Sequence, residues 1–225
     1  MDLLVKGARV ISPGDNFDKE LDILIKKGVI EKIAKGIKAP KAKVINAKGK
    51  VAVPGLIDMH THLREPGRED KESLYTGSLA AAAGGFTAIA CMANTNPVND
   101  NAAVTRFILE QARLAPAKVL PIAAISQGMQ GEVLVEMGDL VEAGAVAFSD
   151  DGKTVPNSKL LRHALEYASL FEKPLFCHCQ DNALFADGII HEGVISAGHG
   201  LVGIPPLAEE IDIARTIMLA EYLKV

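Results

Sequence analysis

Three histidines and a pair of aspartates have the residue types and spacing of a metal site in this chain of 225 residues. His60 and His62 lie two positions apart at the end of the apolar run GLIDMH, so both imidazoles are expected to point to the same side of a strand. His178 lies in the run PLFCHC, and Asp150 and Asp151 follow the run AVAFS. Imidazole and carboxylate groups bind zinc-type cations, and a carboxylate can bridge two ions in two-metal hydrolysis.

Each of these features also has a structural alternative. His178 could be a core histidine beside Cys177 and Cys179, which alternate to the other side of the strand and are interpreted as packing residues. Paired acids before a glycine are typical of a turn and a helix cap. The residues alone leave the choice between Asp150 and Asp151 open.

Two further polar residues could bind a substrate. Arg64 continues the alternating series from His60 and His62, which would place a guanidinium just beyond the imidazoles. Asn94 lies in CMANTNPVND after the second apolar run, where its amide could bind a planar carboxylate or ureide, or belong only to a turn.

The elements that must position these groups begin at Pro54. Five apolar runs, GLIDMH, FTAIACM, KVLPIAAI, AVAFSD and PLFCHC, alternate with helical patterns over residues 71–85, 101–114, 131–145, 157–171 and 205–223. Strand and helix in alternation predict a parallel α/β sheet. An open doubly wound sheet and a (β/α)8 barrel both fit this alternation. The GxGxxG and GxxxxGK[ST] motifs do not occur, and ligand-type residues at a strand end favour the barrel. We therefore expect an α/β fold with a partial (β/α)8 TIM-type barrel of about five βα units.

Residues 1–53 have a different composition. The strand-like pieces LLVKGARVI, LDILIKKGVIEKIA and AKVINAKGKVAV are β-branched and lysine-rich, and IKKG is typical of a hairpin turn. The sequence predicts a small N-terminal β module over residues 1–53, followed by the barrel portion over residues 54–225.

Composition and charge exclude several classes of protein. The 24 Lys and Arg against 28 Asp and Glu give a net charge of −4 without a basic run, which argues against nucleic-acid binding. No apolar stretch is long enough to span a membrane, and the charged first residues are unlike a signal peptide. Three cysteines do not form a disulfide framework. We expect a cytoplasmic protein.

The segments GLIDMHTHLREPG, AGGFTAIACMANTNP, AGAVAFSDDG and PLFCHCQD together resemble dihydroorotases of the long bacterial type, in the amidohydrolase superfamily. The MANTNP segment distinguishes dihydroorotases from hydantoinases and allantoinases better than the HxH motif does. The resemblance extends over the whole chain and implies zinc-dependent, reversible hydrolysis of L-dihydroorotate to N-carbamoyl-L-aspartate in de novo pyrimidine biosynthesis.

The resemblance also implies roles for single residues. His60, His62 and His178 match metal ligands, and Asp151 matches an aspartate that replaces the carboxylated lysine of many relatives. One or two zinc ions are expected. Substrate binding is implied for Arg64 and Asn94, together with His62.

A further metal-binding histidine, a catalytic aspartate and strands that complete the β module are implied beyond residue 225. We therefore expect the chain to be incomplete and inactive alone, and to form homo-oligomers or pair through exposed sheet edges. Two alternatives remain. One is a non-catalytic dihydroorotase-like subunit that acts as a scaffold for aspartate transcarbamoylase. The other is a cyclic amidase of the hydantoinase or allantoinase type.

Overall fold

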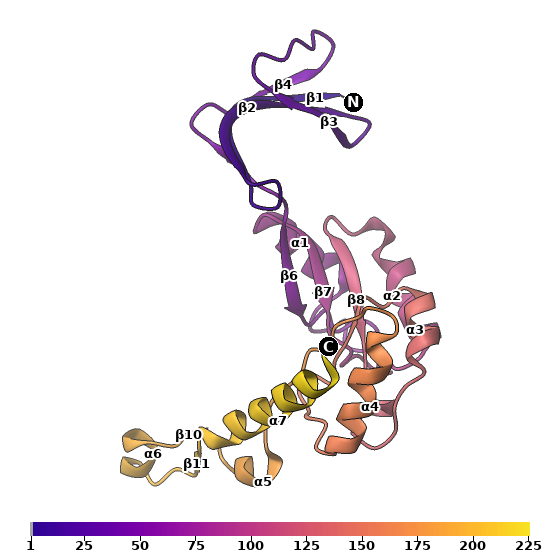
Figure 1. The fold of residues 1–225 in the computed structure, drawn as a ribbon, viewed down its shortest axis with the longest axis vertical. Coiled ribbons are helices and arrows are strands. Elements are labelled where there is room, and N and C mark those ends of the chain that lie inside the picture. The colour runs from indigo at the N-terminus through magenta and orange to yellow at the C-terminus, as the bar shows by residue number, and fades with distance from the viewer. Residues whose placement is uncertain (1) are drawn as a thin grey trace. The chain divides into compact units, whose positions relative to one another are not determined.

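The computed structural model describes residues 2–225. The chain divides into two compact units, Met1–Gly55 and Leu56–Val225 (Figure 1). Each unit has its own hydrophobic core, and the candidate site residues all belong to the second.

The first unit is a mixed sheet with strand order β3-β2-β1-β4, in which β5 also pairs with β1. Its strands are β1 (Leu3–Ser12), β2 (Phe17–Lys26), β3 (Val29–Ala34), β4 (Lys43–Asn46) and β5 (Val51–Ala52). The hairpin between β2 and β3 turns at Lys27 and Gly28, which both have positive φ, as the IKKG sequence predicted. Asp22 on β2 is buried and accepts hydrogen bonds from the N–H groups of Gly7 and Ile37.

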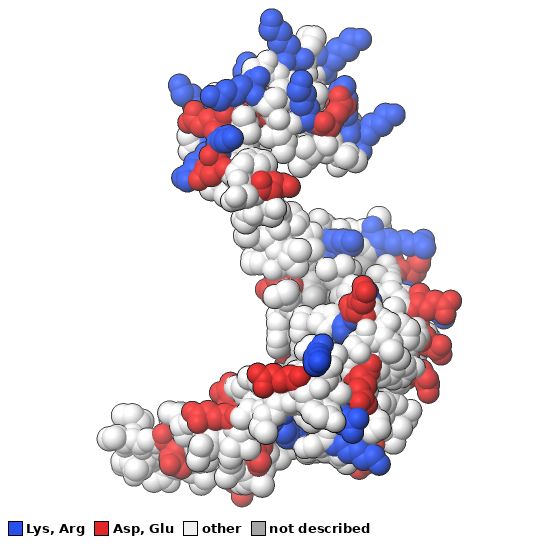
Figure 2. Space-filling model, in the orientation of Figure 1, with Lys and Arg blue, Asp and Glu red and all other residues white. Residues whose placement is uncertain are grey.

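Lysines are dense around this sheet (Figure 2). The edge strand β3 exposes the apolar side chains of Val29 and Ile30. Lys27 and Lys32 lie beside them in the sequence. Charged residues on an edge strand oppose pairing with another chain, so the lysines are explained without a nucleic-acid partner.

The second unit contains a four-stranded parallel sheet in the order β6-β7-β8-β9. The strands are β6 (Leu56–Thr61), β7 (Phe86–Cys91), β8 (Lys118–Ala123) and β9 (Ala147–Phe148). Between and after them lie α1 (Leu74–Ala83), α2 (Ala102–Gln111), the short helix η1 (Ala112–Leu114), α3 (Met137–Ala143) and α4 (Ser158–Ser169). The predicted alternation of parallel strands and helices is confirmed, and the sheet is an open, partial barrel.

The fifth apolar run aligns with the sheet but forms only one bridge to it, between Leu175 and Phe148. The N–H of Phe148 donates to Pro174, and the N–H of Phe176 donates to Phe148. Beyond this point the hydroxyl of Ser149 donates a hydrogen bond to the carbonyl of Phe176. The regular pattern of backbone hydrogen bonds between neighbouring strands therefore does not continue. The expected fifth strand is therefore a short extended segment.

The helix predicted over residues 131–145 was wrong in its first part, because α3 begins only at Met137. Gly131 has a φ of 71°, and Val135 donates its N–H to the carbonyl of Ile125 instead of to a helical neighbour. The tertiary hydrogen bonds to residues 125–127 thus override the apolar spacing of this segment.

After the fifth run the chain forms short elements and then a long helix. The short elements are α5 (Asn182–Phe185), β10 (Ile190–His191), α6 (Val194–Gly198) and β11 (Gly203–Ile204), and the long helix is α7 (Leu207–Leu223). Helix α7 contacts α4 and α5. Within residues 2–225, no helix is long and apolar enough to cross a membrane.

Strand β6 of the parallel sheet differs in burial from the other three strands. Ile89 on β7, Ile122 on β8 and Phe148 on β9 are fully buried. On β6, by contrast, Ile57 and Met59 are exposed by 56% and 63%. The most deeply buried strands of this sheet are therefore β7, β8 and β9.

Candidate metal centre

His60 and His62 are positioned by the end of β6, where the chain leaves the sheet. The pairing of β6 with β7 is irregular between Asp58 and Thr61, so His60 lies within a distorted stretch. Thr61 re-establishes the contact with β7 and the residue after it. Its hydroxyl donates to the carbonyl of Ala90, and its carbonyl accepts the N–H of Met92. This anchor lies between the two histidines and holds both at the carboxyl edge of the sheet.

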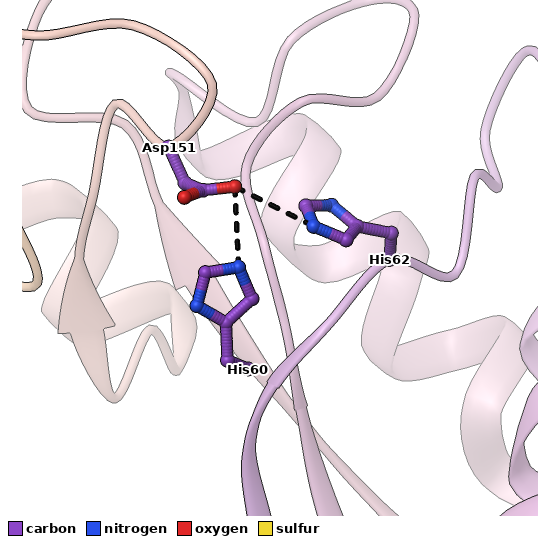
Figure 3. Close-up of side chains that lie close together, drawn as sticks. All are labelled: His60, His62 and Asp151. Carbon is purple, nitrogen blue, oxygen red and sulfur yellow. Dashed lines mark ion pairs between the residues drawn. The ribbon is translucent and has the colours of Figure 1, made fainter. Parts of the chain in front are cut away.

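Both imidazoles point at one carboxylate oxygen of Asp151 (Figure 3). The Nε2 atoms of His60 and His62 lie 3.2 and 3.4 Å from Oδ2 of Asp151. The three ligand atoms of this group lie within 4.8 Å of one another. The predicted convergence of the HxH pair is therefore present.

His178 approaches the other oxygen of the same carboxylate. Its Nδ1 atom lies 3.4 Å from Oδ1 of Asp151. One carboxylate thus faces two imidazoles through one oxygen and a third imidazole through the other. That is the arrangement expected of a carboxylate that bridges two cations.

The two neighbouring aspartates point in opposite directions. Asp150 is 1% exposed and accepts hydrogen bonds from the N–H of Ile125 at 2.7 Å, the N–H of Ser126 at 3.1 Å and the hydroxyl of Ser126. Burial raises the pKa of the Asp150 carboxyl, and the hydrogen bonds from Ser126 and Ile125 counteract that rise. Asp151 is the aspartate that faces the histidines.

Asn94 contacts the site through His62. Its Oδ1 atom lies 3.1 Å from Nδ1 of His62, so the ring nitrogen donates to the amide oxygen. The donation leaves the lone pair of neutral His62 on Nε2, which is the atom that faces Asp151. We did not expect this contact, because the sequence suggested either a substrate-binding role for Asn94 or a place in a turn.

Arg64 lies two residues after His62, with a positive φ of 46°. The loop after Arg64 packs closely against the segment that follows β7. The N–H of Asn96 donates to the carbonyl of Pro66, and a Cβ added to Gly67 would lie 1.9 Å from the carbonyl oxygen of Asn96. The loops that carry Arg64 and Asn94 are therefore in close backbone contact.

A cleft of about 630 Å³ opens beside His60 and His178. His60, Asp151 and His178 line it, and so do His191 and Glu209. This volume is in the range of small-molecule sites. The predicted substrate-binding residues His62, Arg64 and Asn94 are not among the described residues that line this cleft. His191 had no predicted role, and nothing in its local sequence marks it as a cleft residue.

The comparisons with known proteins identify the family. The sequence model of the dihydro-orotase-like family matches residues 49–223. This chain belongs to the dihydroorotase-like family. The resemblance read from the motifs is thereby confirmed.

Curated relatives of the dihydroorotase-like chain cover it almost completely. It is 52% identical to a dihydroorotase of Syntrophus aciditrophicus, over 99% of this chain and 53% of that protein. It is 50% identical to a dihydroorotase of Geobacter sulfurreducens, again over 99% of this chain and 53% of that protein. The chain therefore spans about half the length of the curated relatives it matches.

Solved structures show the same fold at low sequence identity. The L-hydantoinase of Arthrobacter aurescens superposes with a TM-score of 0.79 at 21% identity, over 98% of this chain and 51% of that one. A D-hydantoinase structure gives a TM-score of 0.74 at 23% identity. The predicted fold class, a partial TIM-type barrel after a small β module, is confirmed.

The donor set of the dihydroorotase-like chain fits a divalent cation. When His62 is neutral and its Nδ1 donates to Asn94, the lone pair on Nε2 faces a carboxylate oxygen at 3.4 Å, and these two acceptors repel each other. A cation between the two acceptors removes the repulsion. Imidazole nitrogen and carboxylate oxygen are both ligands for divalent metal ions.

Proposed function

We propose that the protein containing this chain is a zinc-dependent dihydroorotase, which reversibly hydrolyses L-dihydroorotate to N-carbamoyl-L-aspartate in pyrimidine biosynthesis. The observation that supports the proposal best is the convergence of His60, His62 and His178 on the two oxygens of Asp151. The names of relatives about half identical to the chain support this choice of reaction.

Four residues would hold the metal. His60 and His62 face one oxygen of Asp151, and His178 faces the other, so these residues would hold one or two zinc ions. Bound zinc would polarise the substrate carbonyl and lower the pKa of a water molecule. Asp151 is the central residue of the set, because each histidine contacts it.

Other residues of the chain would orient the ligands and the substrate. Asn94 fixes the ring of His62 through Nδ1, which keeps Nε2 free for the cation. Arg64 would bind the substrate carboxylate through charge-assisted hydrogen bonds, with support from the Asn94 amide and His62. The close contact between Gly67 and Asn96 would hold the loops of Arg64 and Asn94 together.

The domain organisation is part of the proposal. Residues 1–53 would form a β module that further strands complete, and residues 54–225 would form the N-terminal portion of a metal-dependent hydrolase barrel. Two observations support it: the chain spans 53% of its relatives, and β6 exposes Ile57 and Met59 at the edge of the sheet. Further barrel strands would cover that edge.

The test is to purify the full-length protein, measure its zinc content and compare L-dihydroorotate with dihydrouracil as substrates. We expect bound zinc and faster turnover of dihydroorotate, because only this substrate has a carboxylate for Arg64. His60→Ala should remove both zinc and activity. His163→Ala is the matched control, since this histidine lies on α4 with half of its side chain exposed.

Two outcomes would contradict the proposal. A protein without zinc and without dihydroorotate turnover would instead fit a scaffold, which a binding assay with aspartate transcarbamoylase would examine. Faster turnover of dihydrouracil would indicate a hydantoinase-type amidase.

A further inference from the structure

Asp212 on α7 is a buried carboxylate outside the metal ligands, and it joins two separate segments of the chain. Its residue exposure is 5%. Oδ2 accepts the hydroxyl of Thr154 at 2.6 Å and the N–H of Gln180 at 2.9 Å, and Oδ1 pairs with Arg215 on the same helix. Thr154 and Gln180 are thus held by a single carboxylate oxygen.

Arg215 extends the same connection. Its guanidinium donates to the carbonyls of Val155 at 2.8 Å and Pro156 at 2.6 Å. The Nε atom of Arg215 is buried without a hydrogen-bond partner among the described residues, and Asp212 is the carboxylate that pairs with this guanidinium. Helix α7 therefore fixes the segment of residues 154–156 through two side chains that support each other.

The two joined segments are those that carry metal ligands. Asp151 lies three residues before Thr154, and His178 lies two residues before Gln180. The backbone pairing between these segments reaches only to Phe148 and Phe176. Past that point, Asp212 contacts both segments, and it lines one small cavity with His178.

We propose that Asp212 is a positioning residue for the metal centre. By fixing Thr154 and Gln180, it sets the separation of Asp151 and His178, whose facing atoms lie 3.4 Å apart. The inference rests on the proposed metal site. Groups that orient metal ligands without touching the ion typically account for about 10- to 100-fold in metal affinity.

The test must separate positioning from general stability. Asp22 offers a matched control, because it is also 5% exposed and accepts two backbone N–H groups, but it lies in the other unit of the chain. Asp212→Asn and Asp22→Asn are made in the full-length protein. Zinc affinity is measured by competition with a chelating dye, the Co²⁺ absorption spectrum is recorded, and unfolding is followed without metal.

We expect Asp212→Asn to weaken zinc binding by about 10-fold or more and to alter the Co²⁺ spectrum. Asp22→Asn should keep the affinity of the parent even if it unfolds more readily. Thr154→Val, which removes one hydrogen bond and is milder, should give a smaller loss in the same direction. In a protein that already carries His178→Ala, Asp212→Asn should have less effect than in the parent, because the two residues act on one site.

Three results would overturn the inference. Asp212→Asn and Thr154→Val could both bind zinc as the parent does, or Asp22→Asn could weaken binding as much as Asp212→Asn does. In either case the proposed metal site stands and only the positioning role fails. A parent protein that binds no metal would refute the metal site itself, and the inference with it.

Discussion

The carboxyl edge of the parallel sheet has two sides, and Asp150 and Asp151 show the difference between them. Asp150 faces the core, where three donors from Ile125 and Ser126 satisfy it. Asp151 faces the cleft, where its carboxylate oxygens meet imidazole nitrogens at 3.2 to 3.4 Å. Both aspartates are buried, but Asp150 accepts hydrogen bonds from N–H and O–H groups whereas Asp151 faces imidazole nitrogens.

The comparison shows how a carboxylate proposed as a metal ligand differs from a structural carboxylate. A structural carboxylate gathers N–H and O–H donors, because each buried donor needs an acceptor. A ligand instead lies among groups that also offer lone pairs, as His62 does toward Asp151. Such a cluster is favourable only when a cation or extra protons lie between the groups.

The largest expected effect is on zinc affinity, when Asp151, which faces the cleft, is replaced. Asp151→Ala should reduce zinc affinity by more than about 100-fold, since the loss of a ligand exceeds the loss of its support. Its stability without metal should change by less than about 1 kcal/mol, because Asp151 lies at the cleft and satisfies no core donor. Zinc titration and urea unfolding measure the two quantities. A variant that binds zinc normally would end the distinction between the two aspartates.

Replacement of Asp150, which faces the core, should mainly change the free energy of unfolding. Asp150→Ala should lower the free energy of unfolding by about 3 kcal/mol, because the buried donors of Ile125 and Ser126 lose their acceptor. Urea unfolding of the metal-free protein measures it, with Asp151→Ala as the control. Equal stability of the two variants would contradict the assignment of Asp150 to the core.

The contact between the loops that carry Arg64 and Asn94 should be sensitive to a single added methyl group. Gly67 has a φ of 96°, and an added Cβ would lie 1.9 Å from the carbonyl oxygen of Asn96. Gly67→Ala should therefore cost about 2 kcal/mol in unfolding free energy, from backbone strain and overlap together. Gly14→Ala is the control, because its Cβ would meet no atom within 4 Å. If the two variants were equally stable, the close backbone contact between Gly67 and Asn96 would be refuted.

Much of this arrangement was predictable from the sequence, because it depends on local periodicity. The two-residue spacing of His60 and His62 in an extended run is enough to place both imidazoles on one side of a strand. The repeated alternation of apolar runs with helical patterns is enough to predict parallel strands, whose carboxyl ends share one edge.

Other features depend on contacts between distant residues and were not predictable. Which of Asp150 and Asp151 turns toward the core depends on the N–H groups of residues 125 and 126, which no local pattern connects to them. The role of Asp212 likewise depends on hydrogen bonds to residues 58 and 32 positions away. A single acid between apolar residues in IDIA was the only sequence signal for it.

The smallest expected effect separates the two roles of Asn94. Asn94→Ala should weaken zinc binding by about 10-fold, because His62 loses the acceptor that fixes its ring. Asn94→Asp keeps an acceptor for Nδ1 and should retain zinc affinity, but its negative charge should repel the substrate carboxylate and raise KM. Zinc titration and steady-state kinetics of the full-length protein measure the two effects. Loss of zinc in both variants would mean that the amide itself is required at the metal, and an unchanged KM in Asn94→Asp would remove Asn94 from the substrate site.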